Sequence, residues 1–193
     1  RTSFVELFNI AAAHGMDVYL TTDVMFFPVG EDEAGCSADD TLLILQRALS
    51  DIFQSFPQVK GIIFRIGECD GKDVHGSFRS RLVLQKPRHV RSLIDGLLPL
   101  CEQHERLMIF RTWTVGSGTI GDLIWNRNTF DRVFDRIDSP NFVISMKYGE
   151  SDFFRYLPLN KLFFRSEHRK IIEMQTRREY EGAGQYPSFI GWD

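Results

Sequence analysis

The feature that most constrains the fold is the regular alternation of two kinds of segment along the chain. Short apolar runs rich in Val, Ile, Phe and Tyr are typical of buried strands. These runs lie at residues 17–27, 61–66, 106–113, 142–147 and 170–175. Between them, apolar residues recur at intervals of three and four, which predicts amphipathic helices. The helical segments lie at residues 41–56, 87–104 and 129–137, with a further one at residues 4–14 before Gly15.

Strands that alternate with helices predict an α/β fold in which helical crossovers join the strands of a parallel sheet. A doubly wound sheet and part of a (β/α) barrel both satisfy this pattern, and the alternation alone does not choose between them. A whole (β/α)8 TIM-barrel usually takes about 250 residues, whereas this chain has 193 and begins at Arg1. If the fold is a barrel, we expect residues 1–193 to form one segment of it with about five strands, cut from a longer multidomain protein.

Composition excludes some classes of function. The chain is 43% hydrophobic and 25% charged, as in a globular domain with a sizeable core. Its net charge of -3 argues against general binding to nucleic acid, so an anion site would have to be local. No apolar run of membrane-spanning length is present, so we expect no membrane partner. The three cysteines, Cys36, Cys69 and Cys101, form no CxxC pair and suit free thiols, which weakly favours a cytoplasmic location over export.

Ionisable and polar residues gather where the predicted strands end. In chain order they are Asp23, Arg65 and Glu68, Arg111 and Trp113, Lys147 and Asp152, and Gln175 and Glu179. In a parallel barrel the carboxyl ends of the strands meet on one face, where catalytic groups lie. Carboxylates and cations together at such a face can bind an anionic, hydroxyl-rich ligand and transfer protons to it.

Each of these residues also has a structural interpretation. Glu68 can be an exposed loop acid, Asp152 a helix cap, and Glu179 a partner in a surface ion pair. Arg65 and Arg111 stand inside apolar strands, and burying an unpaired guanidinium costs several kcal/mol. Each arginine therefore needs a carboxylate, either from an internal salt bridge or from a ligand.

Five segments, in order, resemble successive strands of the α-glucuronidases, the glycoside hydrolase family 67 enzymes that remove glucuronic or 4-O-methylglucuronic acid from xylan fragments. They read HGMDVYLTTDVMFFP (14–28), DIFQSFPQVKGIIFRIGECDG (51–71), LMIFRTWTV (107–115), VISMKYGESDFF (143–154) and IIEMQTRREYEGAG (171–184). The most specific motif is Glu173-Met174-Gln175-Thr176-Arg177-Arg178-Glu179-Tyr180, which is similar to the family's Glu-Phe-Gln-x-x-x-Glu-Tyr run. The resemblance spans most of the chain.

This resemblance implies a catalytic (β/α) barrel that hydrolyses a uronic-acid glycoside with inversion. Glu68, in Gly67-Glu68-Cys69, is similar to the general acid of the family's Ser-Glu-Gly motif. Asp152 and Glu179 are similar to its second and third carboxylates, and either one can be the base. No metal or organic cofactor is implied.

The resemblance also implies a set of substrate-binding residues. Arg111 is similar to the glucuronate-binding arginine of a Trp-Arg-Ala-Phe run, and Lys147 to the lysine of a Lys-Asn-Gly-x-x-Asp run. The family's lysine four residues before the acid is not reproduced, and Arg65 stands three residues before Glu68 instead. Asp23 and Gln175 are added from their positions at strand ends, and Trp113 as an aromatic that can stack on a sugar or pack in the core.

The expected partner is an acidic oligosaccharide, and a homodimer could form through segments outside this chain. One alternative is a barrel that binds carbohydrate without turnover. Another is a dinucleotide-binding α/β domain, because residues 116–121 spell GxGxxG after a strand. We expect no metal site, because the five histidines are scattered without ligand spacing.

Overall fold

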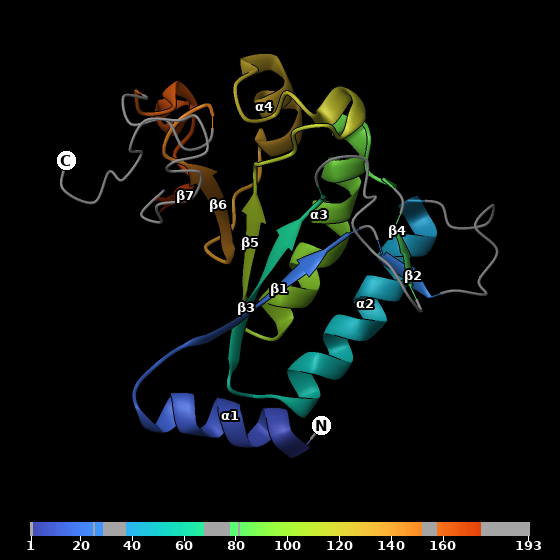
Figure 1. The fold of residues 1–193 in the computed structure, drawn as a ribbon, viewed down its shortest axis with the longest axis vertical. Helices are drawn as coiled ribbons and strands as arrows, with labels where there is room; N and C mark the ends of the chain where they lie inside the picture. The colour runs from blue at the N-terminus through green and yellow to red at the C-terminus, as the bar shows by residue number, and fades with distance from the viewer. Residues whose placement is uncertain are drawn as a thin grey trace, which may run out of the picture.

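Five parallel strands form the central sheet of the computed structural model (Figure 1). The structure describes residues 2–24, 26–28, 38–67, 78–80, 82–151 and 158–174. The strands of the main sheet are β1 (Val18–Asp23), β3 (Val59–Arg65), β5 (Leu107–Arg111), β6 (Phe142–Lys147) and β7 (Arg169–Glu173). They lie in the order β1-β3-β5-β6-β7, and every neighbouring pair is parallel. The predicted α/β class and parallel sheet are confirmed.

Four α-helices overlap the four predicted helical segments. They are α1 (Thr2–Ala13), α2 (Ala38–Ser55), α3 (Pro87–Gln103) and α4 (Arg127–Phe134). Helix α3 contacts both α2 and α4, and Figure 1 shows α2 and α3 on the same side of the sheet. Proline suits the first position of α3 because that position needs no backbone N–H, and the helix buries a stripe from Val90 to Cys101.

An aromatic cluster fixes α4 against the sheet. Phe134 is the centre of this cluster, with its ring centroid 5.8 Å from that of Phe110 on β5 and 5.9 Å from that of Phe142 on β6. Phe130, one turn earlier on α4, lies 4.8 Å from Phe134 in an edge-to-face arrangement. All four rings are at most 1% exposed. Because α4 follows β5, this packing also determines where the connecting loop at residues 112–126 can run.

The predicted strand at residues 17–27 is wrong in one respect, because β1 ends at Asp23 and a separate strand, β2 (Phe26–Pro28), follows. The N–H of Val24 donates to the carbonyl oxygen of Arg65 at 2.8 Å, beyond the last paired residues of β1 and β3. Strand β2 pairs in antiparallel fashion with β4 (Phe78–Ser80). A three-residue strand has no apolar periodicity of its own, so β4 was not predictable from the pattern.

The thiol of Cys101 lies in the core on α3 and is free, as the sequence predicts for it. Burial raises the pKa of the Cys101 thiol to about 12, so it remains a protonated, apolar group at neutral pH. Cys36 and Cys69 lie outside the described residues. None of the described helices combines the length and apolarity needed to cross a membrane.

The close approach of β3 to β5 gives a test of the parallel register. A Cβ atom added at Gly61 would lie 2.5 Å from the carbonyl oxygen of Leu107, a backbone atom that cannot move without disturbing the ladder. We expect Gly61→Ala to lower the free energy of unfolding in urea by about 1–3 kcal/mol, the usual cost of overpacking. The neighbouring exposed substitution Lys60→Ala should change it by less than about 0.5 kcal/mol. Equal effects would contradict the register.

Candidate functional site

The described site residues lie where the parallel strands end. Asp23 and Arg65 are the last residues of β1 and β3 and pair with each other in the register of the sheet. Arg111 and Lys147 are the last residues of β5 and β6. The carboxyl ends of adjacent parallel strands form one edge of the sheet, so these side chains belong to one region of the molecule. The other predicted site residues, Glu68, Asp152, Gln175 and Glu179, lie outside the described residues.

Arg111 is held by a carboxylate that the sequence prediction did not assign to the site. Its Nε donates to both oxygens of Glu173 on β7, at 3.0 and 2.8 Å. The hydroxyl of Ser145 on β6 donates to Oε1 of Glu173 at 2.7 Å. The side chains of Arg111 and Glu173 are only 18% and 23% exposed, so water screens their attraction less than that of a surface pair. This cluster ties β5, β6 and β7 together at their carboxyl ends.

Lys147 lies against Trp113, with its Nζ 3.3 Å from the centroid of the indole ring. The lysine is 9% exposed and the tryptophan 8%. A cation over an aromatic face is attracted by the ring quadrupole, more strongly when both groups are desolvated. One face of Trp113 is therefore occupied by Lys147, and little of the ring is exposed. Stacking of Trp113 on a sugar stays a prediction.

The second arginine also has an internal partner. Nε of Arg65 lies 3.2 Å from Oδ1 of Asp23 on the neighbouring strand, and both side chains are partly exposed. Both arginines thus have the internal salt bridge that the sequence left as one of two alternatives. Recognition of a ligand carboxylate by either arginine stays a prediction.

The glycine-rich segment at residues 116–121 is hydrogen-bonded to the backbone just after the end of β3. The hydroxyl of the buried Ser117 donates to the carbonyl oxygen of Gly67 at 3.0 Å. Gly67 has a φ of +94°, a conformation that favours glycine, and it directly precedes Glu68 in the sequence. The loop after β5 therefore fixes the backbone from which the predicted general acid follows.

This loop does not have the arrangement of a dinucleotide site. The backbone N–H groups of Ser117, Ile120 and Gly121 are already bonded to carbonyl oxygens of the protein. Helix α4 begins only at Arg127, after a further turn, so the glycines do not lead directly into a helix N-terminus. A pyrophosphate cradle requires backbone donors and a helix start at that position. These observations weigh against the dinucleotide alternative.

Glu173 was missed because the predicted strand ended at Gln175, two residues too late. Strand β7 ends at Glu173, which pairs in register with Lys147. A search for polar residues at strand ends selects Glu173 once the end of this strand is set correctly. The ends of strands, however, are the part of an apolar pattern that is hardest to place from sequence. Ser145 carried no such signal, because a serine in an apolar strand is usually only a small buried residue.

Comparison of the chain with protein-family models and with curated proteins gives no match. Among the described residues, no group of three or more His, Cys, Asp or Glu side chains is arranged to hold a metal ion.

The cluster around Glu173 predicts a stability difference between two ion pairs. Glu173→Gln leaves the half-buried Arg111 without its charged partner, so we expect the free energy of unfolding in urea to fall by about 1–3 kcal/mol. The control is Asp131→Asn, which breaks a pair between Asp131 and Arg165 whose side chains are both 38% exposed. Breaking an exposed pair should lower the free energy of unfolding by less than about 1 kcal/mol. Equal losses in the two variants would show that the Arg111 cluster has no special stabilising role.

Proposed function

We propose that this chain is part of the catalytic barrel of an inverting glycoside hydrolase similar to the α-glucuronidases. Its substrate would be an α-linked glucuronic or 4-O-methylglucuronic acid on a xylo-oligosaccharide or a related acidic glycan. The observation that carries this proposal is that Asp23, Arg65, Arg111 and Lys147 end four adjacent parallel strands of one sheet. A cation-rich strand-end region of this kind suits an anionic sugar.

The strand order supports a barrel over a doubly wound sheet. A doubly wound sheet reverses its strand order at a switch point, where the ligand binds. The strands of the main sheet that the structure describes follow one another in chain order, with no reversal. Right-handed crossovers in a constant direction leave the helices on one face of the sheet. The contacts of α3 with α2 and α4 agree with such a row of helices.

In the proposed site, Arg111 and Lys147 would bind the uronate carboxylate from the ends of two adjacent strands. Glu173 would keep the guanidinium plane of Arg111 in one orientation, and the ring of Trp113 would keep the ammonium of Lys147 close to the sheet. Groups whose positions are fixed before the ligand arrives lose less conformational entropy on binding. The proposed recognition thus rests on cations held in place by the protein.

The proposed catalytic carboxylates follow these strand ends in the sequence. Glu68 comes three residues after the end of β3, Asp152 five residues after β6, and Glu179 six residues after β7. Glu68 would protonate the glycosidic oxygen, and Asp152 or Glu179 would activate water on the opposite face of the sugar. Inverting enzymes hold the acid and base about 6.5 to 9.5 Å apart to admit that water.

Substitution of the carboxylates tests the catalytic roles. We expect Glu68→Gln and Glu179→Gln each to slow the release of glucuronic acid from aldouronic xylo-oligosaccharides by at least about 100-fold, the usual effect of removing a general acid or base. Glu150→Gln is the matched control, because Glu150 is an exposed carboxylate two residues before Asp152 in the sequence and has no proposed role. Undiminished release by Glu68→Gln would refute its role as acid. Binding of the oligosaccharide without release by the unchanged protein would favour the carbohydrate-binding alternative.

Recognition of the uronate charge is tested separately with Lys147→Met, which keeps an unbranched chain against Trp113 and removes the ammonium. Without that charge, the preference for a glucuronate substrate over its neutral methyl ester should fall about tenfold, mainly through a higher KM for the acid. The comparison of kcat/KM for the two substrates measures this directly. An unchanged preference would exclude Lys147 from uronate binding.

A further inference from the structure

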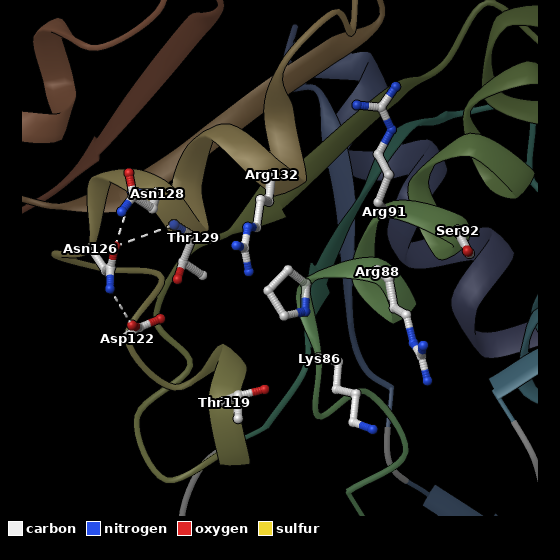
Figure 2. A pocket seen from close by; sticks show the side chains of 11 residues that line it. Lys86, Arg88, Arg91, Ser92, Thr119, Asp122, Asn126, Asn128, Thr129 and Arg132 are labelled. Carbon is white, nitrogen blue, oxygen red and sulfur yellow. Dashed lines mark hydrogen bonds between the residues drawn. The ribbon is translucent and has the colours of Figure 1, made fainter.

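A cationic cavity lies between the start of α3, helix α4 and the short 3-10 helix η2 (Gly118–Ile120) (Figure 2). Its volume is about 890 Å³. The residues that line it belong to two segments, residues 86–92 and 119–132. Arg65, Arg111, Lys147, Trp113 and Glu173 are not among the residues that line it. The residues of the proposed glycosidase site therefore do not account for this cavity.

Three of its four cations have no partner among the described residues. Lys86, Arg88 and Arg132 are exposed and make no ion pair or side-chain hydrogen bond with any residue in the part of the chain that the structure describes. Arg91 differs from them, because its Nε donates to both oxygens of Asp95, at 2.8 and 2.9 Å. Figure 2 shows the guanidinium of Arg91 directed away from Lys86 and Arg88.

Asp122 is the single acid among the described residues that line the cavity, and it does not neutralise these cations. Asp122 accepts a hydrogen bond from Nδ2 of Asn126 at 2.6 Å, and that asparagine caps α4 through the N–H groups of Asn128 and Thr129. Three cations without an ion-pair partner among the described residues therefore line the cavity together with one described carboxylate. The local excess of positive charge is notable in a chain whose net charge is -3.

These three cations come from the start of α3 and from the last turn of α4, so a ligand in the cavity can contact both helices. Lys86 and Arg88 stand at the beginning of α3, and Arg132 lies on α4; Figure 2 shows Arg132 on a different side of the cavity from the other two. Guanidinium groups bind planar or tetrahedral oxyanions through pairs of N–H donors. The hydroxyl of Thr129 and the amide of Asn128 add neutral polar groups to the same wall.

We propose that this cavity binds a small dianion, either a phosphate monoester or a dicarboxylate, through Lys86, Arg88 and Arg132. A phosphate monoester carries about -1.5 to -2 charges at pH 7, which matches the local excess of positive charge. The volume lies in the range of about 300 to 1,000 Å³ that is usual for small-molecule sites, so the anion can carry a body as large as a sugar. The site is independent of the proposed glycoside hydrolysis.

Calorimetric titration at low salt tests the proposal, with glucose 6-phosphate as the phosphate monoester, succinate as the dicarboxylate and glucose as the neutral control. We expect saturable binding of at least one dianion and none of glucose, and the better-bound dianion identifies the anionic group. Arg132→Gln and Arg88→Gln should each weaken that binding by about tenfold or more, since a hydrogen bond between charged groups is lost. Both arginines are exposed, so the variants should fold, which circular dichroism checks.

Two controls separate this site from general charge effects and from the strand-end region. Arg47→Gln removes the same charge from an exposed position on α2 that does not line the cavity, and should change the affinity less than about twofold. Lys147→Met should also leave the affinity unchanged. The proposal is overturned if neither dianion binds, if Arg47→Gln weakens binding as much as Arg132→Gln, or if Lys147→Met abolishes binding that Arg132→Gln preserves.

Discussion

The parallel register of the main sheet is the constraint on which the rest of the structure depends. It places the carboxyl ends of five strands along one edge, and the sequence puts Asp23, Arg65, Arg111, Lys147 and Glu173 at those ends. Charges brought together in a partly buried region must be paired or they destabilise the fold. The salt bridges of Arg65 with Asp23 and of Arg111 with Glu173, and the contact of Lys147 with Trp113, meet this requirement. The same interactions order these cations at the edge where we propose that the ligand binds.

The packing of the helices determines where the loops at this edge run. Packing of Phe134 between Phe110 and Phe142 sets α4 against β5 and β6, so the loop between β5 and α4 must turn back over the end of β3. There the hydroxyl of Ser117 reaches the carbonyl oxygen of Gly67. Ser117, which lies in the run that the sequence offered as an alternative nucleotide-binding motif, supports the backbone of Gly67, the residue before Glu68 in the sequence. The glycines of that run give a tight turn, with positive φ at Gly116 and Gly118.

Much of the fold was predictable because its elements carry strong periodicity. Strand β6 and the start of α3 lie at their predicted residues, since the largely apolar run FVISM and a stripe of apolar residues after Pro87 have few other interpretations. Strand β4 was missed because three residues give no period. Within the site, the sequence indicated that Arg65 and Arg111 need carboxylates, but pairing depends on strand neighbours that are 42 and 62 residues away in the chain. The cationic cavity has the same origin, because its charges come from two helices that only the tertiary fold brings together.

The stereochemistry of the product tests the central claim most directly, because it reports on the arrangement of acid, base and water at the strand ends. Proton NMR of the first turnovers on an aldouronic xylo-oligosaccharide distinguishes the two anomers of free glucuronic acid before they interconvert. An inverting enzyme acting on an α-linked uronic acid must release the β-anomer first, and we predict that result. Release of the α-anomer first, or no release of glucuronic acid, would contradict the account.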